Sequence, residues 1–271
     1  MTDNVFDVSG RVILITGAAS GLGAAMAEAF ARRDAKVVML DRDAEPLESA
    51  YERLSAFGAD AMRVTVDITD RTRLHDAIDA AVARLGKLDV VFANAGVSAG
   101  PGFASVEGQR QEAGSLEAVP ADLWDAVLRV NLSGVFFTIQ RAAYHMKRQH
   151  HGKIIVTTSI ASFRNENWVG TPYMPAKSGA AHLMRQAALE LAHDNITVNA
   201  IAPGFFPTNL GRGRPMSDGA AAAILRKVPL RRFGRMADIQ GIALFLASSA
   251  SDFVTGAEIP VDGGAALGHA C

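Results

Sequence analysis

Three glycines close together near the start of the chain form the first motif that could do chemistry. They stand in the stretch ITGAASGLG, Ile15 to Gly23, after a short β-branched run and at the beginning of a helical stretch. Glycine allows positive φ angles and lets backbone N–H groups approach a pyrophosphate at the start of a helix. This position indicates a nucleotide-binding loop. A glycine-rich turn that only connects a strand to a helix is the alternative, because glycine patterns alone are weak signals.

A tyrosine and a lysine could form an acid/base pair further along the chain. Tyr173 and Lys177 stand at the beginning of another helical stretch, at a spacing that lets both side chains project from one face. A free tyrosine has a pKa near ~10, and lowering that pKa to about 7 requires roughly 4 kcal/mol. Positive charge at close range in a poorly solvated site can supply this energy. The alternative is an aromatic and a lysine that share a helix start without any chemistry.

Further motifs follow the glycine loop in a characteristic order. The glycines have the spacing T-G-x-x-x-G-x-G, and after them come NAG (94–96), NLSG (131–134), a serine at 159, YMPAK (173–177), NAIAPG (199–204) and VDGG (261–264). This combination resembles the short-chain dehydrogenase/reductase family over essentially the whole chain. The resemblance implies a nicotinamide dinucleotide cofactor, hydride transfer between an alcohol and a ketone, and a homotetramer.

The residue that ends the second predicted strand bears on the choice of cofactor. Asp41 stands where an acidic residue meets the adenosine ribose, and its carboxylate would repel a 2′-phosphate. No lysine or arginine interrupts residues 18–20, so the loop offers a 2′-phosphate no partner. Arg42 could bind such a phosphate, but it could equally stack on the adenine or lie in solvent. The sequence favours NAD over NADP.

The resemblance assigns cofactor contacts to residues that follow several predicted strands. The matching positions are Gly17, Ser20, Gly21, Leu22, Gly23, Asp41, Arg42, Asp67, Ile68, Asn94, Ala95, Gly96, Tyr173, Lys177, Pro203, Gly204, Phe206 and Thr208. Asp67 and Ile68 match the family's adenine contacts. Asn94 could instead tie neighbouring strands together. Phe206 stands where the family often has a smaller aliphatic residue.

The resemblance also gives four residues catalytic roles, namely Asn131, Ser159, Tyr173 and Lys177. Hydride transfer to or from C4 of a nicotinamide requires a proton to reach or leave the alcohol oxygen, and Tyr173 is the implied acid/base. Ser159 is implied to hydrogen-bond the substrate oxygen, and Lys177 the nicotinamide ribose. Asn131 lies inside a predicted helix, where asparagine is unfavourable, so it either kinks the helix or holds a water in a proton relay to Lys177.

Short apolar runs alternate with longer helical stretches that must position these motifs. Strands are predicted at 11–16, 36–40, 61–66, 88–93, 153–158, 196–201 and 257–261, and helices near 21–33, 43–57, 70–86, 120–148, 173–193 and 235–249. Apolar strands separated by helices indicate a parallel sheet covered on both faces. We expect one α/β domain over 1–271, a Rossmann-like doubly wound sheet of about seven strands. Its nucleotide-binding half covers about 10–96 and its catalytic and substrate half about 97–271.

Composition excludes several other classes of protein. Hydrophobic residues make up 49% of the chain and charged residues 20%, and the net charge of −1 gives no basic field for nucleic acid or anionic membrane. No basic region followed by an apolar run opens the chain, and no apolar run reaches the roughly 18 residues of a spanning helix. The only cysteine is Cys271, and no Cys, His or carboxylate set has metal-site spacing. We expect a cytoplasmic protein without metal.

Polar side chains near the predicted catalytic residues bear on the substrate. The candidate substrate contacts are Ser159, Arg164, Trp168, Phe205 and Arg212. Hydrogen-bonding groups in this region favour a polyol, a sugar, a sugar acid or a hydroxy acid. The alternative is an apolar pocket for a steroid-like or aromatic alcohol, formed by Trp168 and Phe205.

Two irregular segments, 97–120 and 205–223, interrupt the alternation of strands and helices. Such segments are usually functional lids or disordered excursions. The second follows a strand end directly, which favours a lid, and it turns helical at its alanines.

A dinucleotide-binding regulator without turnover is a possibility from a different class. Such a protein would not need a proton-transfer set, so the presence of all four candidate catalytic residues argues against it. The implied homotetramer would pair the helices at 120–148 and 173–193 across one interface and the C-terminal segment across another.

Overall fold

Alternating side chains of the central strands build two apolar cores, one on each face of a sheet. In β1 (Val12–Thr16), Val12 and Leu14 belong to one core, whereas Ile13 and Ile15 belong to the other. All four side chains are fully buried. Because successive side chains of a strand point to opposite faces, this strand needs cover on both sides.

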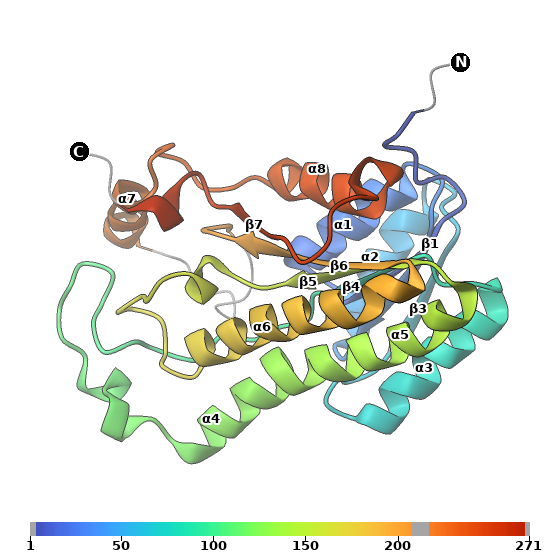
Figure 1. The fold of residues 1–271 in the computed structure, drawn as a ribbon. Helices are drawn as coiled ribbons and strands as arrows, with labels where there is room; N and C mark the ends of the chain where they lie inside the picture. Colours follow the sequence, from blue (N-terminus) through green and yellow to red (C-terminus); the bar gives the residue numbers. More distant parts are fainter. Residues whose placement is uncertain (1–3, 208–216, 269–271) are drawn as a thin grey trace.

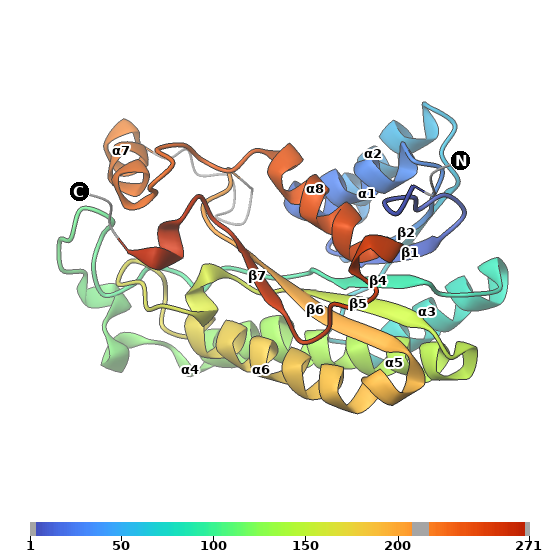
Figure 2. The same ribbon diagram turned by 45° about the horizontal axis from the view of Figure 1, so that its top comes forward.

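The computed structural model describes residues 4–207 and 217–268 and shows seven parallel strands in one sheet (Figures 1 and 2). The strand order is β3-β2-β1-β4-β5-β6-β7, and every pairing is parallel. After β1 the strands are β2 (Lys36–Asp41), β3 (Ala61–Thr65), β4 (Val90–Ala93), β5 (Gly152–Thr157), β6 (Ile196–Pro203) and β7 (Glu258–Val261). The strand order reverses between β1 and β4, which is where such folds leave a crevice for ligands.

Two layers of helices enclose this sheet. The helices α1, α2 and α8 pack on one face, and α3, α5 and α6 pack on the other (Figures 1 and 2). Their bounds are α1 Gly21–Ala31, α2 Ala44–Ser55, α3 Arg71–Leu85, α5 Val135–Gln149, α6 Tyr173–Leu191 and α8 Met236–Ala247. The predicted single-domain, Rossmann-like doubly wound fold is confirmed.

One predicted helix differs in detail. The stretch 120–148 is α4 (Ala121–Leu128), a π-helical segment η3 (Arg129–Gly134) and then α5. Asn131 lies within the π-helical segment, which supports the kink alternative for this residue. Wider turns of this kind frequently occur at functional sites.

The segment 97–120 is a packed wall rather than an excursion. Pro101 forms an antiparallel bridge with Val169, and the Gly102 N–H donates to the Trp168 carbonyl at 3.2 Å. A Cβ at Gly102 would collide with the Asn167 carbonyl oxygen, so the two backbones lie in close contact. Two short 3₁₀ turns, η1 (Glu112–Gly114) and η2 (Leu116–Ala118), complete the segment.

The second irregular segment contains a helix at its alanine-rich end. This is α7 (Asp218–Lys227), as predicted, and it lies apart from the two helical layers (Figure 1). Thr208 and Arg212 lie outside the described residues.

Candidate active site

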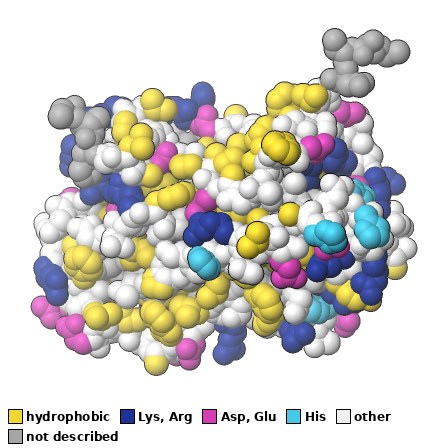
Figure 3. Space-filling view, viewed as in Figure 1, with side chains coloured by type: hydrophobic (Ala, Val, Ile, Leu, Met, Phe, Trp, Pro, Cys, Tyr) yellow, Lys and Arg dark blue, Asp and Glu magenta, His cyan; other side chains and the backbone are white. Residues whose placement is uncertain are grey.

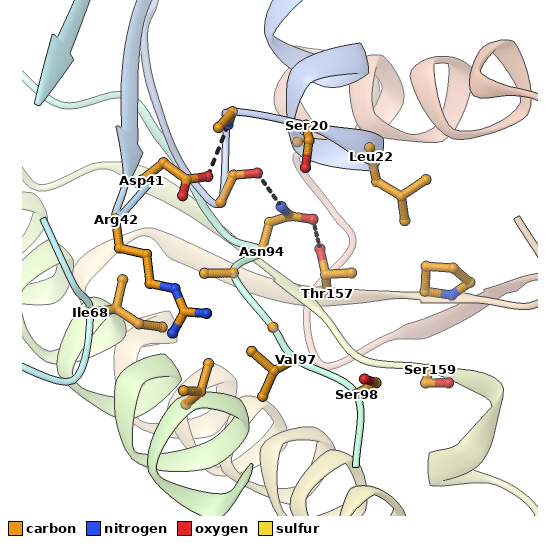
Figure 4. A pocket seen from close by; sticks show the side chains of 18 of the residues that line it. Ser20, Leu22, Asp41, Arg42, Ile68, Asn94, Val97, Ser98, Thr157 and Ser159 are labelled. Carbon is orange, nitrogen blue, oxygen red and sulfur yellow. Dashed lines mark hydrogen bonds between the residues drawn. The ribbon is translucent and has the colours of Figure 1, made fainter. Parts of the chain in front are cut away.

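A cleft of about 960 Å³ opens at the carboxyl ends of the strands, beside the reversal of strand order. The loop after β1, the ends of β2, β4, β5 and β6, and the beginning of α6 line it (Figure 4). The structure brings together in this cleft every predicted cofactor-binding residue that it describes. Thr208 is the one such residue outside the described part of the chain.

The glycines of the first loop are needed largely for contact with the chain itself. Gly17 has a φ of +69°, and a Cβ there would lie 2.8 Å from the Ala95 Cα. A Cβ at Gly23 would collide with the Gly17 carbonyl oxygen and lie 2.7 Å from Asn94 Nδ2. Glycine therefore lets the loop, the start of α1 and the segment after β4 pack against one another.

The beginning of α1 offers free hydrogen-bond donors to a ligand. Its N-cap residue, Ser20, makes no side-chain capping hydrogen bond. The first backbone N–H groups of a helix have no partner within the helix, and they favour an anion. Because Ser20, Gly21 and Leu22 line the cleft, this end of α1 fits a dinucleotide phosphate.

The Asp41 carboxylate is held by the glycine loop. Its Oδ2 accepts a hydrogen bond from the Ala19 N–H at 3.0 Å, and its Oδ1 accepts one from the Asp43 N–H at 3.1 Å. The neighbouring Arg42 guanidinium lies 3.8 Å from the Asp43 carboxylate, and its side chain is 52% exposed. Figure 4 shows Arg42 beside Ile68 at the cleft.

The Asn94 side chain ties strand ends together. Its Nδ2 donates to the Thr16 carbonyl at 3.0 Å. Its Oδ1 accepts from the Thr157 hydroxyl at 3.0 Å, as Figure 4 shows. The strand-tying interpretation of Asn94 therefore holds in this structure. The backbone of Ala95 and Gly96 follows along the cleft.

The side chains of Asn131, Ser159, Tyr173 and Lys177 come from three elements and meet around one end of the cleft. The Lys177 ammonium is buried, donates to the Thr157 carbonyl at 2.8 Å, and lies 5.7 Å from the centre of the Tyr173 ring. Asn131 is also buried, and its amide both accepts from the Val97 N–H and donates to the Val97 carbonyl, each at 2.9 Å. Gly96 lies between them, because a Cβ there would be 3.0 Å from Asn131 Oδ1 and 3.5 Å from Lys177 Nζ.

Burial shifts both titratable groups of this set. It raises the pKa of the Tyr173 phenol above its usual value of 10.0, while a hydrogen bond with the Ser159 side chain acts in the opposite direction. It lowers the pKa of the Lys177 ammonium to about 8. The protein alone therefore keeps Tyr173 protonated at neutral pH, and lowering its pKa toward 7 requires a further positive charge in the cleft.

Of the hydroxyl groups at the end of β5, Ser159 is the one beside Tyr173. The Thr157 hydroxyl donates to Asn94 Oδ1, and the Thr158 hydroxyl donates to the Ile201 carbonyl at 3.1 Å. The Ser162 hydroxyl points to Glu258 Oε1 at 2.5 Å. These three hydroxyls are engaged with other groups of the protein, whereas the Ser159 hydroxyl lines the cleft and acts on the pKa of Tyr173.

Of the candidate substrate residues, Arg164, Trp168 and Phe205 do not line this cleft, and Arg212 lies outside the described residues. The buried Glu166 forms an ion pair with the Arg164 guanidinium at 2.9 Å and accepts the Trp168 indole N–H at 3.0 Å, and Arg164 also donates to the Ala265 carbonyl. The Trp168 and Phe205 rings are in tilted contact, with centroids 5.6 Å apart. Arg164, Glu166 and Trp168 are thus engaged mainly with one another and with the backbone.

Several residues that the sequence analysis did not single out also line the cleft, among them Val97, Ser98 and Leu123. Val97 and Ser98 directly follow the NAG motif, and this adjacency could have predicted that they line the site. Figure 4 shows both. Leu123 lies on α4 and had no signal beyond its place in a helix.

The described residues contain no group of three or more His, Cys, Asp or Glu side chains that could hold a metal ion. Nor does any helix in residues 4–207 and 217–268 combine the length and apolar character needed to cross a membrane.

Comparisons with known proteins agree over nearly the whole chain. A family model described as "Enoyl-(Acyl carrier protein) reductase" matches residues 17–266. A cyclohexanol dehydrogenase of Rhodococcus sp. (strain TK6) is 38% identical over 278 residues, covering 97% of this chain and 98% of the relative. A 2-dehydro-3-deoxy-D-gluconate 5-dehydrogenase of Dickeya dadantii is 37% identical, covering 96% and 97%. The structure of a gluconate 5-dehydrogenase from Burkholderia cenocepacia with NADP and tartrate superposes with a TM-score of 0.87 at 33% identity, covering 97% and 98%.

We expect Gly23→Ala to damage both stability and cofactor binding, because its Cβ would collide with backbone. Overpacking of this kind costs about 1–3 kcal/mol, which chemical denaturation would detect. Displacing the loop should also weaken dinucleotide affinity by about tenfold, measured by fluorescence titration. Gly241→Ala is the matched control, since a Cβ there meets nothing within 4 Å. Wild-type stability and affinity in Gly23→Ala would contradict the expectation.

Proposed function

Because this chain belongs to the short-chain dehydrogenase/reductase family of oxidoreductases, we propose that it interconverts a secondary alcohol and a ketone with NAD as hydride carrier. The observation that supports the proposal most is the convergence of Ser159, Tyr173 and Lys177 at one end of the cleft. A polar substrate oxygen between the Ser159 and Tyr173 hydroxyls would meet two hydrogen-bonding groups. Such an arrangement suits proton transfer to or from that oxygen.

Some residues of the cleft would bind the dinucleotide, and others would take part in proton transfer. The free N–H groups of α1 and the Asp41 carboxylate would hold the dinucleotide at its phosphate and ribose. The nicotinamide, when bound, supplies the hydride-accepting or hydride-donating carbon and, in its oxidised form, a positive charge. Lys177 would hold the nicotinamide ribose, and its ammonium favours the ionised form of Tyr173.

Tyr173 gives the proton to the ketone oxygen or takes it from the alcohol. Ser159 keeps that oxygen within reach. Tyr173 is partly buried, so the electrostatic effect of nearby charge is stronger than it would be in solvent. We also propose that Asn131 holds a water of the proton relay to Lys177.

Two substrate classes have separate support. A small polar substrate, such as a polyol, sugar, sugar acid or hydroxy acid, is favoured by the likeness to gluconate and deoxygluconate 5-dehydrogenases. An apolar cyclic or aromatic alcohol is favoured by the likeness to a cyclohexanol dehydrogenase. The pairing of Arg164 with Glu166 and the contact of Trp168 with Phe205 also favour the apolar class, because they leave the loop with few free polar groups. We propose the polar class first and test both together.

The cofactor proposal predicts that NADH binds more tightly than NADPH. The Asp41 carboxylate repels a 2′-phosphate, so Asp41→Ala should narrow the difference between the two dissociation constants, measured by fluorescence titration. Asp60→Ala, an exposed carboxylate that does not line the cleft, is the control and should leave the difference unchanged. Tighter NADPH binding by the wild type would overturn the proposal and point to Arg42 as the phosphate partner.

The mechanism predicts that Tyr173→Phe lowers kcat by about 100- to 10,000-fold, because the variant lacks the acid/base hydroxyl. NADH affinity should stay close to wild type. Activity is followed by absorbance of the reduced cofactor on sugars, sugar acids, polyols and hydroxy acids, and on cyclic, aryl and steroid alcohols. Tyr51→Phe on α2 is the matched control.

Three outcomes of this screen would change the proposal. Near-normal kcat in Tyr173→Phe would assign the acid/base role elsewhere. Turnover of apolar alcohols alone would overturn the polar substrate class. Binding of NADH without turnover of any alcohol would favour a non-catalytic regulator.

We also propose a homotetramer, on the family resemblance and on the exposed apolar side chains along α4 and α5. Figure 3 shows apolar side chains gathered over these helices, and Trp124, Phe136 and Tyr144 are among the exposed ones. Patches of this kind mark interaction surfaces. Light scattering should give the mass of four chains, and Phe136→Asp should lower it. A wild-type monomer at micromolar concentration would reject the assembly.

A further inference from the structure

A buried carboxylate outside the cleft reaches the turn that bears Ser159. Glu258 is the first residue of β7, and its side chain is 6% exposed. Its Oε1 accepts from the Ser162 hydroxyl at 2.5 Å, and its Oε2 lies 3.3 Å from Arg185 Nη1. Ser162 belongs to the turn after β5, and Arg185 belongs to α6. This one carboxylate therefore joins three elements.

Ser162 in turn holds the backbone of Ser159. Its N–H donates to the Ser159 carbonyl oxygen at 2.9 Å, and its Oγ, whose single proton is shared between this carbonyl and Glu258, lies 2.6 Å from the same oxygen. The Ser159 Oγ accepts the Ala161 N–H at 3.2 Å. The position of the Ser159 hydroxyl thus depends on the geometry of this short turn. Glu258, on β7, holds the turn in place through its hydrogen bond with Ser162.

The distance between Ser159 and Tyr173 matters because the two hydroxyls must share one substrate oxygen. They lie on different elements, the turn after β5 and the beginning of α6, so their separation depends on contacts between those elements. A displacement of about 1 Å at a reacting group can cost about 100-fold in rate. Glu258 contacts both elements from a third, through Ser162 on one side and Arg185 on the other.

We propose that Glu258 is a positioning residue for the reaction: through Ser162 it fixes the turn that presents the Ser159 hydroxyl to the substrate oxygen beside Tyr173. This inference rests on the proposed function, since it assigns the residue to the same reaction. A buried carboxylate that served stability alone would also keep its partners, so the test must separate the two roles.

The first measurement compares kcat with cofactor affinity. Glu258→Ala and Ser162→Ala should each lower kcat by about tenfold or more while the NADH dissociation constant stays within about twofold of wild type. The double variant should be no slower than either single one, because both remove the same link. Glu258→Gln and Ser162→Thr keep an acceptor and a hydroxyl, and they should retain most of the wild-type kcat.

Ser251→Ala is the matched control for loss of stability. Its hydroxyl is buried and donates to the Leu246 carbonyl at 3.1 Å, away from the cleft. This variant should unfold at lower denaturant concentration yet keep the wild-type kcat. Additive losses in the Glu258 and Ser162 variants, or full kcat in Glu258→Ala, would overturn the proposal.

The second measurement needs no turnover. Hydrogen exchange by mass spectrometry should show faster exchange of the 159–163 backbone in Glu258→Ala, with unchanged exchange in the glycine loop. Unchanged exchange at 159–163 would overturn the proposal whatever the activity. If the wild type turned over no alcohol, the proposed function would fail, whereas faster exchange would still support the role of Glu258 in holding Ser159.

Discussion

Asn94 and Thr157 join the two halves of the cleft through hydrogen bonds at neighbouring strand ends. The Asn94 amide donates a hydrogen bond to the last residue of β1 and accepts one from the Thr157 hydroxyl. The Thr157 carbonyl accepts a hydrogen bond from the Lys177 ammonium. The same few groups therefore set the distance from the glycine loop to the lysine. Because an unpaired buried ammonium is very costly, Lys177 can remain charged inside the protein only while this carbonyl stays in place.

The polar groups around this connection are mostly occupied by one another. The Asn131 amide hydrogen-bonds the Val97 backbone with both its oxygen and its nitrogen. Glu166 forms an ion pair with Arg164 and accepts a hydrogen bond from the Trp168 indole. Interiors that satisfy their own polar groups are rigid, and they present few free donors to a ligand. The hydroxyls of Ser159 and Tyr173 differ because both line the cleft and lie close to each other. They are therefore the hydroxyl groups that are placed to meet a substrate oxygen.

The parts of this arrangement differ in how visible they are in the sequence. The strands were predictable because short, continuously apolar runs between helices indicate buried parallel strands. Tyr173 and Lys177 were predictable because their residue types and their spacing are specific. The π-helical turn at Asn131 was not, since one wide turn leaves the helical pattern of apolar residues nearly unchanged. Arg164 was predicted as a substrate contact, because a sequence does not say which polar groups will hydrogen-bond to each other. Glu258 was not singled out for the same reason.

The wall formed by 97–120 and the segment around Trp168 limits how this family member can diversify. Cβ atoms at Gly102 or Gly170 would each collide with a backbone carbonyl of the facing segment, so the two stretches fit only as a matched pair. If a loop from a relative replaced one of these stretches, the unchanged stretch would no longer fit against it. Replacing one stretch therefore requires a matching replacement of the other, so the two would have to be exchanged together.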